Sequence, residues 1–240
     1  MLQMQLPAVL QNQYADAQID DYAKLARTSF PWQAPLRMEV LARSSHPAAT
    51  ASSTTQDRTM LRGTAGFGFW NYPFSVRGDI LFLPEAIWFF YASPPSNMAL
   101  VPGIPGWGWK AQVIHSMRPG AIAALLPTAL STGWARVSGH TQPAARWVQR
   151  LSGAQEAVLA TDMTTWHTYT LEWYPHAARF WVNGTPVLHV PNPPTRPLGF
   201  VAWLDNQYAV ATPRGSFRFG TVACDPQSFE IDSITIQPLA

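Results

Sequence analysis

The chain has 240 residues, of which hydrophobic residues make up 47% while Asp, Glu, Lys and Arg make up only 12%, with a formal net charge of +2. This composition fits a domain with a sizeable core and excludes a disordered chain, since disorder requires few apolar residues. The basic residues form no run, so no nucleic-acid partner is expected.

Targeting and membrane signals are not visible in the sequence. The first 14 residues lack a basic stretch followed by a long apolar one, and no window reaches about 18 uninterrupted apolar residues. We therefore expect neither a signal peptide nor a membrane partner. The single Cys224 excludes an internal disulfide but fits both a reducing compartment and secretion, so localisation and oligomeric state stay open.

The first part of the chain predicts an N-terminal extension followed by strands. Residues 1–31 carry apolar side chains at roughly helical spacing near their end, which predicts a short helix or an irregular wrap. Alternating positions predict a strand over 36–45 and another over 61–71. Residues 79–92 are the most apolar stretch and predict a buried strand, which Pro84 divides.

The middle of the chain predicts a long loop followed by a strand. The loop over 93–109 is rich in proline and glycine, as in segments that frame binding sites, and its Trp107 and Trp109 are expected to form an exposed platform. A strand is predicted over 110–117, and 119–132 fits a loop or a short helix. Over 141–159 a helix competes with a strand.

The clearest local structure is a β-meander over Trp166 to Val190. Tyr169, Leu171 and Trp173 alternate with polar residues, which indicates a half-buried strand. Asn183-Gly184 then supplies the two positive-φ positions of a type I′ hairpin. The last strands are predicted over 198–210, 216–224 and 228–239. Short strands bounded by proline and glycine, without a linker, predict one β-sandwich domain over 1–240.

Three stretches carry a family resemblance. The first runs from Trp-His-Thr-Tyr through an aromatic-x-Leu-Glu-Trp strand to an Arg-Phe-x-Val-Asn-Gly hairpin, over 166–184; the others are GFGFWN at 66–71 and FEIDSITIQ at 229–237. They resemble the concanavalin A-like lectin/glucanase superfamily, in particular glycoside hydrolase family 16. The resemblance implies an all-β, antiparallel jelly-roll sandwich with at most one or two short helices, and an oligosaccharide or polysaccharide as partner.

The catalytic motif of that family is missing. Family 16 enzymes carry Glu-x-Asp-x-Glu on one strand, so that one carboxylate attacks the sugar and another protonates the leaving oxygen. This chain contains no such motif. Glu85 matches the nucleophile, whereas Ile87 and Phe89 fall where the other two acids belong. The resemblance implies Glu85 as catalytic residue, with Asp79 or Asp205 as candidate acid.

Sugar binding is predicted from aromatic and amide side chains. Eleven Trp residues exceed what a core of this size needs, and an indole face can stack on a sugar ring. Residues 203–208 gather an indole, a carboxylate, two amides and a phenol. The candidate binding residues are Trp70, Trp107, Trp109, Trp203, Asp205, Asn206, Gln207 and Tyr208, with Trp88 on the same concave face.

A metal is implied at one position only. In the family, an aspartate at a comparable place in the last strand helps to hold a structural calcium, which makes Asp232 the candidate ligand, near Glu230. The six histidines show no zinc spacing, and no other cofactor is expected.

Three functions fit these observations. The first is hydrolysis of a β-linked polysaccharide by a protein that resembles family 16. The second is a non-catalytic, lectin-like glycan-binding module, and the third is a sandwich that recognises protein through the same aromatic patch. Hydrolysis requires two carboxylates within about 10 Å of each other inside the cleft, which separates it from the other two.

Overall fold

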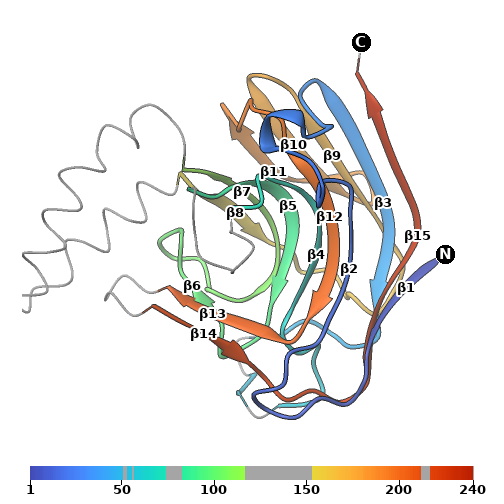
Figure 1. The fold of residues 1–240 in the computed structure, drawn as a ribbon, viewed down its shortest axis with the longest axis vertical. Coiled ribbons are helices and arrows are strands. Elements are labelled where there is room, and N and C mark those ends of the chain that lie inside the picture. Colours follow the sequence, from blue (N-terminus) through green and yellow to red (C-terminus); the bar gives the residue numbers. More distant parts are fainter. Residues whose placement is uncertain (51–52, 56, 74–82, 117–152, 212–216, 240) are drawn as a thin grey trace, which may run out of the picture.

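Two six-stranded antiparallel sheets lie face to face, and a small third sheet projects beyond one of them (Figure 1). The computed structural model describes residues 1–50, 53–55, 57–73, 83–116, 153–211 and 217–239. The antiparallel jelly-roll sandwich predicted from the sequence is confirmed. Within the described residues, no helix is long and apolar enough to cross a membrane.

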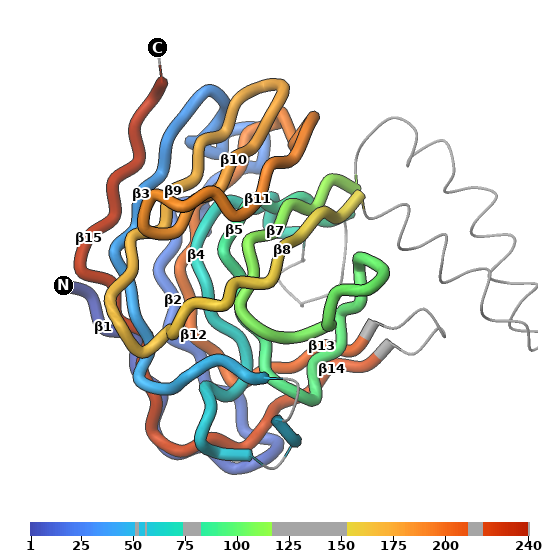
Figure 2. Tube along the Cα trace, turned by 180° about the vertical axis from the view of Figure 1, so that it is seen from behind, coloured from blue at the N-terminus to red at the C-terminus, as the bar shows by residue number. Residues whose placement is uncertain are grey.

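The outer sheet consists, in spatial order, of β1 (Leu2–Leu6), β15 (Gln227–Pro238), β3 (Leu36–Ser44), β9 (His167–Trp173), β10 (Ala177–Val182) and β11 (Thr185–Pro191). The groove sheet consists of β2 (Asp16–Asp20), β12 (Gly199–Asp205), β4 (Thr64–Trp70), β5 (Glu85–Ala92), β7 (Gly108–His115) and β8 (Gln155–Val158). The side sheet consists of β14 (Phe217–Thr221), β13 (Gln207–Ala211) and β6 (Asn97–Met98). It projects from the groove sheet, away from the outer sheet (Figure 2).

The N-terminal residues add one edge strand to each large sheet. β1 pairs with β15 of the outer sheet, and β2 pairs with β12 of the groove sheet. The sequence left a short helix or an irregular wrap open for residues 1–31, and within them residues 16–20 form a strand that hydrogen-bonds to the edge of β12. The helical element found here is a single 3-10 turn, η1 (Arg27–Ser29).

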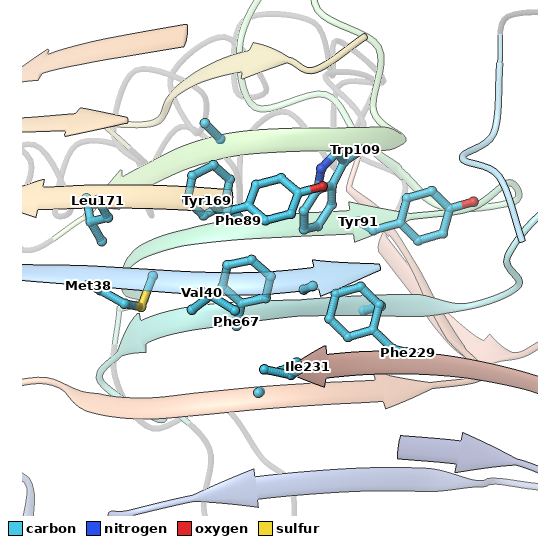
Figure 3. Packing of buried hydrophobic residues seen from close by; sticks show 14 of the residues in the cluster. Met38, Val40, Phe67, Phe89, Tyr91, Trp109, Tyr169, Leu171, Phe229 and Ile231 are labelled. Atoms are coloured by element: carbon cyan, nitrogen blue, oxygen red, sulfur yellow. The ribbon is translucent and has the colours of Figure 1, made fainter. Parts of the chain in front are cut away.

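The core lies between the two large sheets and is rich in aromatic rings (Figure 3). Alternate residues of β3 point into it, including Met38 and Val40, both fully buried. From the groove sheet come Phe67, Phe89 and Trp109, whose rings pack on one another with centroids 5.5–6.1 Å apart. Edge and offset contacts at such distances add to the stabilisation that area burial gives.

The predicted meander is confirmed as β9, β10 and β11. Asn183 and Gly184 have φ values of 50° and 76°, which is the left-handed pair that a tight hairpin between β10 and β11 requires. β5 begins at Glu85, directly after Pro84. Residues 141–159 were predicted to form either a helix or a strand, and β8 lies in the described part of them. Residues 141–152 and 119–132 lie outside the described residues.

Asn206 divides the strand predicted over 198–210 into two strands of different sheets. Its fully buried side chain accepts a hydrogen bond from the Ala15 amide at 2.9 Å and donates to the carbonyls of Gln13 and Val222 at 2.8 and 2.9 Å. These bonds tie the N-terminal segment to the start of β13. Asn206 is thus a structural residue.

Replacing Asn206 by Ala is expected to destabilise the fold. The change leaves three backbone groups without their side-chain partner, one in a buried and two in part-buried contacts, so we expect the free energy of unfolding to fall by about 2–4 kcal/mol. Urea denaturation measures this, with Gln207→Ala as the exposed neighbouring control, which should change stability by less than about 0.5 kcal/mol. Equal effects of the two substitutions would contradict the structural role.

Candidate functional site

A groove of about 750 Å³ lies on the face of the groove sheet that is turned away from the core. Strands β12, β4 and β5 form its floor, β2 forms one edge, and residues of β13 and β14 contribute from the side sheet. Its described lining is richer in apolar than in polar surface and includes several aromatic rings. Concave surfaces of this size and character are typical of ligand sites.

Strand alternation decides which residues reach the groove. Along β5, Ile87, Phe89 and Tyr91 point into the core, whereas Trp88 and Phe90 line the groove. Along β12, Leu204 belongs to the core, while the flanking Trp203 and Asp205 line the groove. Each central strand is therefore buried on both faces.

The floor of the groove is a continuous row of aromatic rings that pack on one another, stacked for Trp88 and Phe90 and tilted for the other pairs. Trp88 lies 5.2 Å from Trp203, 5.3 Å from Phe90 and 5.8 Å from Trp70, measured between ring centroids. Trp203 can lie over β4 because Gly66, its cross-strand partner, has no side chain. A Cβ at Gly66 would stand 2.8 Å from the Trp203 ring and 2.3 Å from the Phe89 carbonyl oxygen.

Two carboxylates face each other at one end of the groove. Asp205 of β12 and Asp16 of β2 are direct cross-strand partners. One carboxylate oxygen of Asp205, Oδ1, accepts hydrogen bonds from the Thr64 amide at 3.2 Å, the Thr64 hydroxyl at 2.8 Å and the Gln207 amide at 2.9 Å. The Thr64 hydroxyl in turn accepts from the Trp203 indole at 2.9 Å, which connects the acid to the aromatic floor.

Burial makes these acids harder to ionise. Desolvation raises the pKa of Asp205 to about 6, more than its hydrogen bonds lower it, and the neighbouring charge of Asp16 adds to the increase. Desolvation also raises the pKa of Asp16, although the Tyr14 hydroxyl donates a hydrogen bond to it. Asp205 therefore changes its protonation state near pH 6.

A second polar cluster lies beside the aromatic floor. The Trp88 indole donates to Gln112 at 2.7 Å, and Glu156 accepts from Gln112 at 2.7 Å and from the Lys110 ammonium at 3.2 Å. All three polar side chains are buried, and desolvation raises the pKa of Glu156 while it lowers that of Lys110. The network fixes the orientation of Trp88.

Of the predicted binding residues, Trp70, Trp203, Asp205 and Gln207 line the groove together with Trp88. Others do not. Trp109 is 1% exposed and packs in the core, because it occupies a core-facing position of β7; it is not part of an exposed platform. Trp107 is half-buried in the preceding loop and is not among the residues that line the groove.

The remaining residues of the 203–208 segment lie apart from one another, because side chains alternate along a strand and because Asn206 lies between the end of β12 and the start of β13. Asn206 is committed to the backbone contacts described above. Tyr208 lines a different pocket, together with Arg58 and Arg62. A cluster that is compact in the sequence is therefore divided among the groove, the interior and a neighbouring pocket.

Glu85 does not reach the groove. It is 2% exposed at the start of β5, on the core-facing side, and its carboxylate lies 2.9 Å from the His115 ring nitrogen Nδ1. The prediction of Glu85 as nucleophile fails on strand parity, since Trp88 and Phe90 hold the groove-facing positions of this strand. Asp79 lies outside the described residues.

The surroundings of Asp232 do not fit a calcium ion. Asp232 is exposed in β15, where the pairing with β3 shifts register. The carboxylate of Glu230 already accepts from Arg43 at 2.7 Å and from Gln3 at 3.0 Å. Within the described residues, no three His, Cys, Asp or Glu side chains gather as a metal site would require.

Tyr14, Asp16, Gln18 and Phe90 also line the groove, although they were not predicted from the sequence. A signal was present for two of them: over residues 16–20, Asp and Gln side chains alternate with Ala17 and Ile19, which is the period of a strand with one polar face. The pattern was masked by the helical spacing of the apolar residues just after it.

No protein-family model and no curated protein sequence matches this chain. Its structure, however, is similar to an endo-acting O-glycanase of the human gut microbiota, with 12% identity over 99% of this chain and 79% of the other and a TM-score of 0.51. The concanavalin A-like jelly-roll fold predicted from the sequence is confirmed. At this identity, the likeness shows the fold alone.

Two further solved structures match more loosely. One is an immunostimulatory antigen and pseudo-β-1,3-glucanase of Mycobacterium tuberculosis, at 13% identity over 87% of this chain and 67% of that one, with a TM-score of 0.42. The other is the catalytic domain of a laminarinase, an endo-1,3-β-glucanase of Thermotoga petrophila, at 11% identity over 92% and 68%, also with a TM-score of 0.42. The chain thus spans about two thirds of their length.

The raised pKa of Asp205 predicts a pH-dependent stability. A folded-state pKa of about 6 against an ordinary value of 3.8 means that the contribution of this group to stability is fully present below about pH 4 and is lost as the pH rises through 6. We expect Asp205→Asn to increase the free energy of unfolding by ~1–3 kcal/mol at pH 8 and to have little effect at pH 4.

Urea denaturation at pH 4, 6 and 8 measures this difference. Asp232→Asn, which removes an exposed carboxylate, is the control and should show no comparable trend. A variant at position 205 that is less stable than the parent at pH 8 would contradict the assignment of a destabilising buried charge.

Proposed function

We propose that the protein binds an oligosaccharide or a polysaccharide chain along the groove. The observation that carries this proposal is the row of aromatic rings on the floor, extended by two exposed rings at the rim. Tyr14 and Phe219 both line the groove and are 58% and 57% exposed. Exposed aromatic faces stack on the apolar faces of sugar rings.

Polar groups around these rings can hydrogen-bond to sugar hydroxyls. Gln18 and Gln207 are exposed amides at the groove, each able to donate and accept. Asp205 accepts only on Oδ1 in the hydrogen bonds described above, so its Oδ2 adds an acceptor. Rings that stack and amides that hydrogen-bond are the combination a glycan requires. The O-glycanase of similar fold acts on mucin glycans, which supports the same ligand class.

Hydrolysis is the second candidate, favoured by the two facing carboxylates. Direct cross-strand partners have Cβ atoms about 4.5–5.5 Å apart, so the carboxyl groups of Asp16 and Asp205 lie within the range that glycoside hydrolysis requires. With a pKa of about 6, Asp205 is mostly protonated below pH 6 and can there donate a proton to a leaving oxygen, and Asp16 would be the second carboxylate.

The binding proposal predicts a loss of affinity when the floor is truncated. Trp88→Ala and Trp203→Ala should each weaken binding at least about tenfold, because each removes a stacking surface worth ~1.4 kcal/mol or more. Isothermal titration calorimetry with a panel of β-linked oligosaccharides measures this. Trp166→Ala, an indole that packs on Arg43 outside the groove, is the matched control and should bind like the parent.

Unchanged affinity in both groove variants would contradict the stacking site. Absence of binding to every glycan of the panel, combined with capture of a protein ligand by the same groove, would replace this function with protein recognition.

The hydrolysis candidate predicts shorter products after long incubation with the same panel, detected by mass spectrometry. Products should disappear in Asp205→Asn and persist in Glu85→Gln, because Glu85 lies outside the groove. Intact substrates throughout would exclude hydrolysis and leave the binding function. Loss of products in Glu85→Gln alone would contradict the placement of the site.

A further inference from the structure

The charge of the groove differs in sign from that of the whole protein. The chain carries a formal net charge of +2, yet the described residues that line the groove include two carboxylates and no lysine, arginine or histidine. Arg218 is exposed on β14 beside Phe219 and does not line the groove. The ligand site is therefore locally acidic.

The two groove carboxylates lack a cationic partner among the described residues. Asp205 is held by hydroxyl and amide donors, and Asp16 by the Tyr14 hydroxyl, and neither forms an ion pair there. The nearest buried ammonium along the sheet, Lys110, is paired with Glu156. Asp205 is buried, whereas Asp16 is exposed and only partly desolvated. Carboxylates that face each other without a counter-charge repel, so a cationic ligand group would stabilise both.

The aromatic floor of the groove also attracts a cationic ligand group. The faces of Trp and Tyr rings carry negative electrostatic potential, and an ammonium within about 6 Å of such a ring is stabilised, most strongly where water is excluded. Trp203 packs against Trp88 of the ring row, and the Thr64 hydroxyl links the Trp203 indole to the Asp205 carboxylate. A cation at this end could contact a carboxylate and an indole face together.

We infer that the groove selects glycans that carry protonated amino groups, of the 2-amino-2-deoxy type, over neutral and anionic glycans. This inference rests on the proposed glycan binding and specifies its ligand class. An ammonium on the sugar ring would be attracted by the two carboxylates, which have no cationic partner among the described residues, and by the indole face. A uronate or a sulfated sugar would place like charge next to Asp16 and Asp205 and be rejected.

The test compares three β-1,4-linked tetrasaccharides that differ only at carbon 2, built from glucosamine, N-acetylglucosamine or glucose. Calorimetry is done in low and in high salt, at a pH above the pKa of Asp205 and below the pKa of the sugar amines. The glucosamine tetramer should bind at least about tenfold more tightly than the other two, corresponding to ~1.4 kcal/mol, and the preference should shrink in high salt.

The double variant Asp16→Asn with Asp205→Asn should lose this preference, so that its affinities for the three tetramers lie within about threefold of one another. Asp232→Asn removes a carboxylate from the outer sheet and should keep the preference. Equal affinities of the parent for all three tetramers would overturn the inference and leave the glycan-binding function standing. A preference that survives in the double variant would also overturn it, whereas absence of binding to any glycan would remove the proposed function as well.

Discussion

Phe67, Phe89 and Trp109 fill the space between the two large sheets, and the strands that carry them are covered on their other face as well. Because side chains alternate along a strand, each core residue fixes its neighbours on the opposite face. The packing of Phe89 thus places Trp88 and Phe90 in the groove. The same alternation in β12 places Trp203 and Asp205 there, so the groove follows from how the core is packed.

The two ends of the groove differ in whether their charged side chains have a partner of opposite charge. Beside Trp88, Lys110 and Glu156 neutralise each other, and Gln112 connects them to the indole. At the other end, the buried Asp205 accepts from the Thr64 hydroxyl and from two backbone amides, the exposed Asp16 accepts from the Tyr14 hydroxyl, and neither has a counter-ion among the described residues. Buried charge without a partner destabilises a fold, and such sites are concentrated where proteins bind or transform ligands. The proposed ligand recognition is assigned to this acidic end of the groove.

The fold of family 16 glycoside hydrolases is present without the Glu-x-Asp-x-Glu motif that defines catalysis in that family. The acids found in the groove come instead from an edge strand and from β12. A sandwich of this kind supplies a concave sheet face whatever its chemistry, because curvature and twist belong to the backbone. Function on this scaffold is decided by the side chains on that face, which here are aromatic and acidic.

The sequence by itself determined the strands of the meander, the hairpin at Asn183-Gly184, the antiparallel sandwich and the aromatic character of its site. These features depend on local alternation and turn chemistry, which are visible along the chain. It could not determine that Trp109 faces the core, that Glu85 lies on the wrong side of β5, or that Asn206 is a structural anchor. Which set of alternate side chains faces the core is decided only when the two sheets pack. Both faces of a doubly buried strand are apolar, so the sequence does not tell them apart. The pairing of Asp16 with Asp205, 189 positions apart, was likewise decided by the tertiary structure, because it depends on which sheet edge the N-terminal segment joins.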